Sequence, residues 1–254
     1  LLACYPRGGY RLEPILSRFM PADTVAWFEE RGVRLKTEKD GRMFPVTNSS
    51  ETIADCLLGE ARKLGVEIKT DVRVDSLERS GERFHLKSRE QSFTTSKLLL
   101  ATGGASKSTT WLQQWGHEVV PDIPSLFTFC CEHPLIEGLQ GVSVPAARLT
   151  LKTDPTYEAE GPFLITHWGV SGPAVLKLSA FAARTLAELN YQADFECDFL
   201  PFYPDEVVLE TLVQQDKPRQ VSTTPVFEEI PKRFWKRLVA QASIPTEKRW
   251  GKLS

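Results

Sequence analysis

The amino-acid sequence predicts an α/β protein with two domains, and three observations support this prediction. A length of 254 residues suits one large domain or two domains of ordinary size. The leucine-rich run at 97–101 lacks polar alternation, which is typical of a strand covered on both faces in a parallel sheet. Pro121 and Pro124 then interrupt the chain, and the residues after them are rich in strand patterns. We therefore predict a domain boundary at 121, with a β-rich domain that also carries helices at 122–254.

The composition narrows the class of protein. Hydrophobic residues make up 41% and charged residues 25%, and no apolar run is long enough to span a bilayer, so we predict a soluble protein without a membrane partner. A net charge of -2 provides no overall basic field for nucleic acid, although a local basic patch stays open. Five cysteines without a C-x-x-C pair predict a reducing, cytoplasmic setting and no metal site. We interpret the adjacent Cys130 and Cys131 as small apolar residues on a strand.

The first domain contains local signals for helices, a hairpin and strands. A helical pattern lies within 11–31, with Pro21 suited to a first helical position and Gly32 just past the end. A hairpin is predicted over 35–45, around the D-G turn at 39–41. Asn48 and Glu51 resemble a capping box for a helix that ends before Gly65. Three strands and a short helix are predicted next, at 66–69, 72–74, 84–86 and 111–115.

The second domain reads as a mixture of strands and helices. Strands are predicted at 126–131, 142–151, 163–166 and 194–200. Helices are predicted at 172–189, 204–215 and 231–242. The last of these helices is basic and amphipathic, so it has one apolar face and one charged face.

The first candidate site is the sequence Ala101, Thr102, Gly103 and Gly104, at the end of the leucine-rich run. Ligands of open α/β sheets bind beyond the carboxyl ends of the strands, and two glycines let the backbone approach a cofactor closely. A tight turn after any buried strand can use the same glycines. Both readings stay open for these residues.

The second candidate is the sequence THWGVSGP at 166–173, which joins a strand to a helix. Ser171 can cap that helix, and the free N–H groups of the first turn can face an anion or an electron-rich ring. His167 is a candidate proton donor or positioning group, and its alternative role is that of a packed residue beside Trp168.

A third candidate, Arg42, lies between turn residues and can pair with a phosphate or a carboxylate, or remain a solvated surface group. The sequence has no G-x-S-x-G elbow, no H-E-x-x-H motif and no phosphate-binding G-x-x-x-x-G-K-[ST] loop. Hydrolase and nucleoside-triphosphatase chemistry is therefore disfavoured.

Several phrases of the sequence occur together, and in the same order, in one known family. They are YPRGG at 5–9, DTVAWFE at 23–29, DGRMFP at 40–45, LLATGG at 99–104, PSL at 124–126 and THWGVSGPA at 166–174. Over nearly the whole chain, the sequence resembles the NAD(P)/FAD-dependent oxidoreductases of the aminoacetone-oxidase-like, or BaiN/RdsA-type, flavoprotein family.

This resemblance implies a Rossmann-type FAD domain that is split in sequence, part of it at residues 1–121, and a β-barrel-like insertion at residues 122–254. It places Val74 where such flavoproteins hold the adenine through backbone groups, although Val74 can also be a core strand residue. It places Thr102, Gly103 and Gly104 near the cofactor. The implied chemistry is hydride transfer between FAD and a small organic substrate or NAD(P)H.

The resemblance also implies that both ends of such a flavoprotein are missing from this chain. The G-x-G-x-x-G turn is expected upstream of Leu1 and the closing flavin-contacting segment downstream of Ser254, so we expect the chain alone to be inactive and colourless. One alternative is a noncatalytic binding or scaffold module. Another is a flavoenzyme that reduces uridine in structured RNA, for which Lys232, Arg233, Lys236 and Arg237 offer a basic surface.

Overall fold

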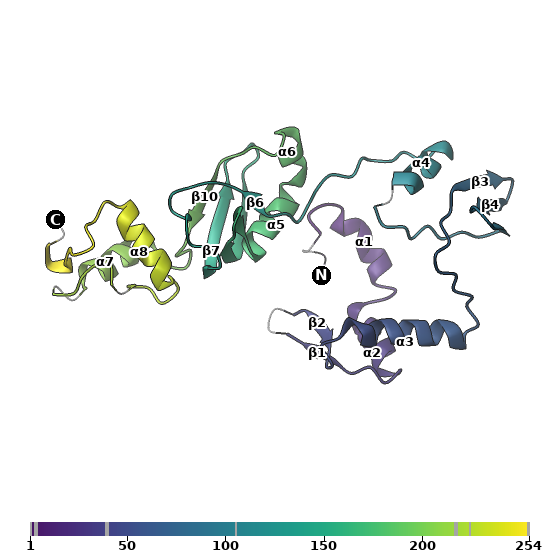
Figure 1. Cartoon of the computed structure of the whole chain (residues 1–254), viewed down its shortest axis with the longest axis horizontal. Helices are drawn as coiled ribbons and strands as arrows, with labels where there is room; N and C mark the ends of the chain where they lie inside the picture. Colours follow the sequence, from purple (N-terminus) through teal and green to yellow (C-terminus); the bar gives the residue numbers. More distant parts are fainter. Residues whose placement is uncertain are drawn as a thin grey trace. The chain divides into compact units, whose positions relative to one another are not determined.

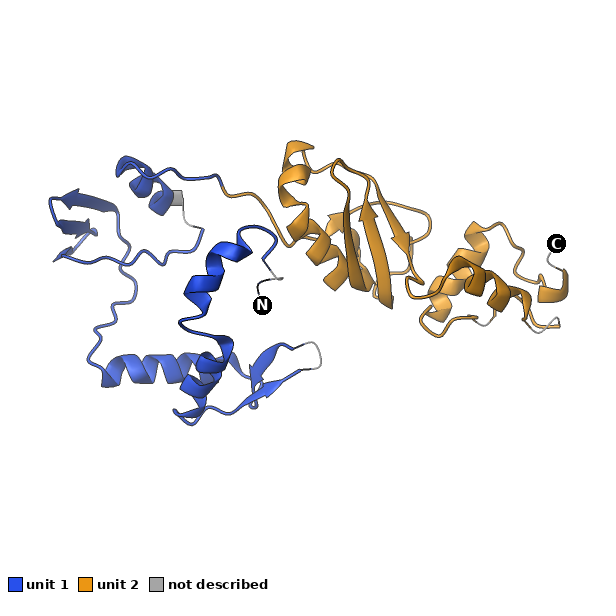
Figure 2. Ribbon diagram, turned by 180° about the vertical axis from the view of Figure 1, so that it is seen from behind, with its two compact units in different colours: residues 1–121 blue, residues 122–254 orange. Residues whose placement is uncertain are grey.

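The computed structural model describes residues 2, 5–38, 41–104, 106–215, 218–223 and 225–252. The chain divides into two compact units, residues 1–121 and residues 122–254 (Figure 2). The units differ in construction. The first is a series of small local motifs, whereas the second has one five-stranded sheet with a common hydrophobic core.

The first unit opens with two helices, a hairpin and a third helix. These are α1 (Gly9–Leu16), α2 (Pro21–Glu29), β1 (Leu35–Thr37), β2 (Met43–Pro45) and α3 (Ser50–Lys63) (Figure 1). Pro21 starts α2 as predicted, and Gly32 follows it with a φ of 80°. The predicted hairpin is confirmed, because β1 and β2 pair antiparallel with Leu35 opposite Pro45. Two residues of its predicted turn, Lys39 and Asp40, lie outside the described residues.

The predicted cap of α3 was wrong by one residue. The capping residue is Ser49, whose hydroxyl accepts a hydrogen bond from the backbone N–H of Glu51 at 3.2 Å. Asn48 instead has a φ of 55°, a left-handed conformation that asparagine tolerates but that is not the extended geometry of a cap. The end of the helix is as predicted, with Gly65 at a φ of 72°.

The remainder of the first unit is a small antiparallel sheet and one helix. Its elements are β3 (Ser76–Ser80), β4 (Arg83–Lys87), β5 (Ser92–Thr95) and α4 (Ser106–Gln114). The strand order is β3-β4-β5, with Leu77 opposite Leu86 and Phe84 opposite Thr95. The predicted strand at 84–86 is therefore confirmed as part of β4.

Three other predicted strands are not strands in this structure. Residues 66–69, 72–74 and 97–101 have no regular secondary structure, and the side chain expected to lie deepest, Leu99, is 87% exposed. A strand persists only where a neighbour pairs with its backbone N–H and C=O groups. Among the described residues of this unit, no strand pairs with these segments. The apolar sequence is present, but the described part of the unit has no sheet that buries it.

The second unit is built on one antiparallel sheet. Its strands are β6 (Phe129–Cys130), β7 (Ser143–Leu151), β8 (Tyr157–Ile165), β9 (Gly169–Ser171) and β10 (Phe195–Asp198), in the order β10-β7-β8-β9-β6. The two edge strands approach each other, because the rings of Phe129 and Phe195 lie 5.6 Å apart. The sheet is therefore curved as in a half-barrel (Figure 1).

Four helices accompany this sheet, together with a short 3-10 turn. They are α5 (Pro173–Phe181), α6 (Ala183–Glu188), α7 (Asp205–Val213) and α8 (Lys232–Gln241), and the turn is η2 (Trp250–Lys252). Helix α5 packs on β7, β8 and β9. The single helix predicted at 172–189 is interrupted at Ala182, where ψ is 5°. Among the described residues, no helix has the length and apolar character needed to cross a membrane.

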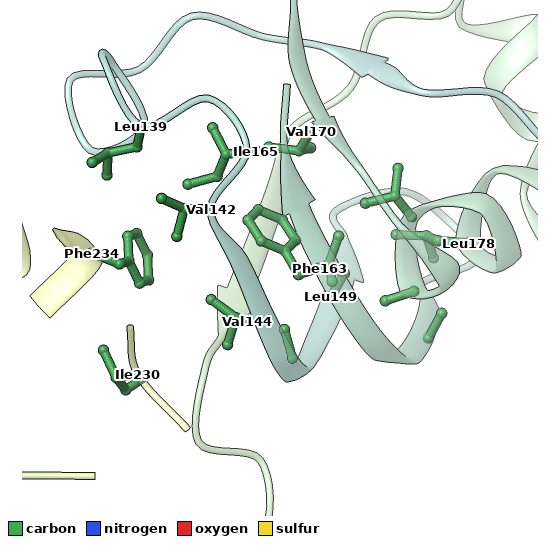
Figure 3. Close-up of a cluster of buried hydrophobic side chains, with 14 of the residues drawn as sticks. Leu139, Val142, Val144, Leu149, Phe163, Ile165, Val170, Leu178, Ile230 and Phe234 are labelled. Carbon is green, nitrogen blue, oxygen red and sulfur yellow. The ribbon is translucent and has the colours of Figure 1, made fainter. Parts of the chain in front are cut away.

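The core of the second unit is made by the inward faces of the sheet and by α5 and α8. Alternation along β7 buries Ala147, Leu149 and Leu151, and helix α8 adds Phe234. Figure 3 shows Leu149 and Phe234 within this core. Rings continue the packing, since Phe199 lies 4.8 Å from Phe234 between ring centroids. Burial of this apolar surface is the main stabilising contribution in the unit.

Candidate functional site

The turn that carries His167 is held in a tight, hydrogen-bonded geometry. It joins β8 to β9, and the N–H of Thr166 donates to the carbonyl of Gly169 at 2.8 Å. The hydroxyl of Thr166 accepts from the N–H of Trp168 at 3.3 Å. A side chain at Gly169 would collide with the carbonyl of Phe129 on β6, so glycine allows β6 to lie directly against this turn.

His167 lines a polar cavity of about 410 Å³. The turn at 166–169 forms one wall, and the segment at 131–137 after β6 forms the other. The two walls are joined where the N–H of Cys131 donates to the carbonyl of Trp168 at 3.1 Å. His167 is exposed rather than part of the hydrophobic core.

A second histidine, His133, lines the same cavity and was missed by the sequence analysis. Its Nδ1 accepts a hydrogen bond from the N–H of Leu135 at 3.2 Å, which leaves the proton of a neutral imidazole on Nε2. Glu132 and Glu137 add carboxylates to the wall. The sequence around His133 forms no motif. His133 becomes a candidate site residue only because the segments at 131–137 and 166–169 line the same cavity.

An apolar cavity of about 470 Å³ shares the segment at 131–136 with the histidine cavity. Phe163, Val170, Phe195 and Phe199 contribute to its lining. Volumes of this size are typical of small-molecule sites, which combine an apolar wall with a few polar groups. Together the two cavities offer an apolar surface next to titratable side chains.

Two cysteines at this place, Cys131 and Cys197, are poor nucleophiles. Burial raises the pKa of Cys131, with a further contribution from Cys130, and burial raises the pKa of Cys197 to about 12. Both thiols therefore stay protonated near neutral pH, and a thiol is much less reactive than a thiolate. Cys130 is exposed on β6 rather than buried, whereas Cys131 packs against the core.

Ser171, the predicted cap of α5, was not found in that role. It ends β9, and its hydroxyl lies 3.2 Å from the hydroxyl of Thr128, which donates to it. The residue before the helix is Gly172, and no side chain caps it. Gly172 has a φ of 100°, and a Cβ there would lie 2.6 Å from the carbonyl of Pro162. The strand and the helix meet so closely that only glycine fits.

The cofactor candidates of the first unit lie around the start of α4. Ala101, Thr102, Gly103 and Gly104 are exposed and lead towards that helix, with Gly103 at a φ of 62° and open space around both glycines. Val74 is half-buried. An ion pair at 3.8 Å between Asp75 and Lys107 brings the segment of Val74 to the first turn of α4.

These residues form an exposed glycine turn before a helix. A glycine turn that leads into a helix presents free backbone N–H groups to an anion. Arg42 belongs to a different region, the hairpin that packs on α2 and α3, where its guanidinium lies 5.6 Å from the ring centre of Phe44. Among the described residues, no group of three or more metal-binding side chains is gathered in one place.

Two family models match this chain. The one described as "HI0933-like protein Rossmann domain" matches residues 1–175, which is more than half of the chain. The one described as "HI0933-like protein barrel and H2TH domain" matches residues 123–254. These matches confirm the predicted fold class, which is part of a Rossmann-type domain followed by a barrel-like domain with helices.

Curated relatives agree with these matches. The chain is 28% identical over 244 residues to a protein of Escherichia coli named ribosomal RNA dihydrouridine synthase, which covers 91% of this chain and 57% of that protein. A protein of Haemophilus influenzae with the same name is 27% identical over 246 residues, 91% of this chain and 58% of that protein.

A third relative has a different name. The 3-dehydro-bile acid delta(4,6)-reductase of Clostridium scindens is 29% identical over 197 residues, 74% of this chain and 47% of that protein. The chain spans about half the length of the curated relatives it matches. The predicted resemblance is confirmed: the chain belongs to the HI0933-like family of FAD-binding oxidoreductases, the BaiN/RdsA-type flavoproteins.

Proposed function

We propose that this chain is part of an FAD-dependent enzyme that adds two hydrogens across a carbon–carbon double bond of an organic substrate. The observation that carries the proposal is the cavity in which His167 and His133 meet beside an apolar surface. The names of the relatives support it, because a dihydrouridine synthase and a delta(4,6)-reductase both reduce a carbon–carbon double bond.

Such a reduction needs two different hydrogen donors. When bound, reduced FAD supplies a hydride to one carbon, and NAD(P)H is the proposed source of that hydride. The protein must then deliver a proton to the neighbouring carbon, and imidazole suits this task near neutral pH. We assign the proton to His167, because Nδ1 of His133 already accepts a hydrogen bond, and we propose that the apolar cavity holds the substrate.

We further propose that the first unit contributes the edge of the FAD site. Val74 and the turn of Ala101, Thr102, Gly103 and Gly104 would offer backbone groups to the cofactor, and Arg42 would offer a guanidinium to an anion. The exposed glycine turn before α4 supports this assignment. Tight FAD binding needs more than these contacts, so we expect this chain alone to hold little flavin.

The decisive test concerns His167 in a flavin-loaded protein that contains this chain. After anaerobic reduction of the flavin, we expect His167→Gln to slow its reoxidation by a conjugated enone about 10²-fold or more, because the proton donor is lost. Flavin absorbance follows the reaction. FAD content and melting temperature should stay nearly unchanged, because His167 is exposed.

Two controls accompany this variant. His117→Gln removes another exposed histidine, from the first unit, and should leave the reaction unchanged. Reoxidation by dioxygen uses no substrate in the cavity and should be equal in all proteins. A His167→Gln protein that melts much earlier, yet reacts with the enone at the normal rate, would show that His167 has a packing role.

A second candidate function differs only in the substrate. The relatives named ribosomal RNA dihydrouridine synthase favour uridine in RNA, whereas the bile-acid reductase favours a small apolar molecule. Flavin reoxidation by a uridine-containing RNA, compared with the enone, separates the two. A noncatalytic module would react with neither acceptor.

A further inference from the structure

Positive charge is concentrated at the C-terminal end of the second unit. Residues 231–252 contain seven basic residues and one acidic residue, a net charge of +6, in a chain whose net charge is -2. The rest of the chain therefore carries a net charge of -8. We propose that this cationic segment, residues 231–252, is a docking surface for the phosphate backbone of RNA. The inference rests on the proposed function, because it supplies the surface that an RNA substrate would need.

Helix α8 separates its apolar and cationic side chains completely. Phe234, Trp235 and Val239 are buried in the core of the unit. Lys232 and Lys236 are exposed and lie one turn apart on the same face. The core thereby fixes the helix, and its two ammonium groups are presented to solvent.

The arginines of α8 attach the helix to the wall of the histidine cavity. Arg233 donates to the carbonyl of Gly138 at 2.9 Å, and Arg237 donates to the carbonyl of Pro134 at 2.6 Å. Pro134 lines the cavity that contains His133 and His167. A strand of RNA held along α8 would therefore lie beside the cavity assigned to proton transfer.

Among the described residues, no acidic side chain neutralises the positive charge of this segment. In the described part of the chain, none of its basic residues forms an ion pair, whereas Lys152 and Arg148 of the sheet pair with Glu196 and Glu160. Arg233 and Arg237 are occupied by carbonyl groups, which leave their charge intact. Unpaired cations gathered in one segment favour binding of a phosphate backbone.

A largely aliphatic cavity that includes two tryptophans borders the same segment. Trp235 and Trp250 are stacked with ring centroids 6.4 Å apart, and both line a cavity of about 550 Å³ between α7 and α8. Trp235 is buried, and its indole N–H donates to the carbonyl of Val221 at 2.7 Å, whereas Trp250 is half-buried. Unpaired bases of RNA are commonly held by stacking on aromatic side chains, so Trp250 favours RNA with unpaired nucleotides. A membrane is a poorer fit, because the apolar face of α8 is buried and cannot insert.

The test measures RNA binding by the whole 254-residue chain. Fluorescence anisotropy with a labelled RNA hairpin that has an unpaired loop gives the dissociation constant at several salt concentrations. We expect Lys232→Gln/Lys236→Gln to weaken binding about tenfold and to lower the salt slope by about 1 to 2, because two phosphate contacts are lost. Lys248→Gln/Lys252→Gln should act in the same direction.

The matched control is Lys177→Gln/Arg184→Gln, which removes the same charge from exposed residues of α5 and α6 in the same unit. The proposal would be overturned if this control weakened RNA binding as much as the lysine variants do. It would also be overturned if the chain bound no RNA, or bound only vesicles of anionic lipid. Reaction of the flavin-loaded protein with the enone should be unchanged by the lysine variants. Enone reduction without RNA binding would contradict the docking surface and support the proposed function. RNA binding without flavin turnover would support the docking surface and contradict the proposed function.

Discussion

At the scale of single residues, the cysteines around the half-barrel illustrate how burial sets reactivity. Cys197 is half-buried on β10, and burial raises its pKa to about 12, whereas Cys130 is exposed on β6. Because the thiolate is the reactive form, the raised pKa keeps Cys197 protonated and unreactive near neutral pH. The neighbouring Cys130 and Cys131 are therefore no sign of redox chemistry with Cys197.

We expect iodoacetamide at mildly alkaline pH to alkylate Cys130 at least about 10²-fold faster than Cys197 in the native chain. Peptide mass spectrometry at successive times gives both rates. In urea the difference should disappear, because unfolding removes the burial that raises the pKa of Cys197. Equal rates in the native protein would mean that the thiol of Cys197 is not protected as the structure shows.

At the scale of elements, the junction between β9 and α5 depends on glycine. A Cβ at Gly172 would lie 2.6 Å from the carbonyl of Pro162, and the φ of 100° is itself unfavourable for other residues. This junction begins three residues after the turn of His167, since β9 is Gly169–Ser171. The helix start therefore helps to position the wall of the candidate site.

We expect Gly172→Ala to lower the free energy of unfolding by about 2–4 kcal/mol, from backbone strain and steric overlap together. Urea denaturation measures the change. Gly141→Ala is the matched control, because Gly141 also has a positive φ, of 82°, but has nothing within 4 Å of its Cβ position. The control should lose only about 1 kcal/mol. Similar losses for both variants would show that the contact with Pro162 is not decisive.

At the scale of the whole molecule, the two units differ in how much apolar surface they bury. The hydrophobic core of the second unit combines its sheet with α5 and α8. Among the described residues of the first unit, the buried apolar side chains are Val33 and Leu77. Local opening is easiest where few apolar contacts must be broken, so the first unit should be the less stable one.

Hydrogen exchange tests this difference directly. We expect backbone amides of residues 1–121 to show protection about 10²-fold lower than those of residues 125–200. Mass spectrometry of peptides from the intact chain provides the comparison. Equal protection in the two ranges would mean that the first unit is stabilised by packing that the structure does not contain.

Much of the local structure could be read from the sequence because its signals act over a few residues. Pro21 marks the start of α2, Gly32 and Gly65 follow helix ends, and the hairpin of β1 and β2 forms where the turn signal indicated. The ordered sequence phrases were also sufficient to identify the flavoprotein family, since two family models confirm that the chain belongs to it. Helix-ending glycines, turns and family motifs need no knowledge of the tertiary structure.

Only the tertiary structure decided the rest. The leucine-rich run at 97–101 carries the pattern of a buried strand, yet a strand also needs neighbours on both sides, and these come from distant residues. His133 has no motif of its own, and it becomes a candidate because the end of β6 folds against the turn of His167. The split of the long helix at Ala182 likewise follows no helix-breaking residue. Pairing, packing and the convergence of side chains depend on contacts between segments far apart in the chain, and those contacts are not encoded in any local pattern.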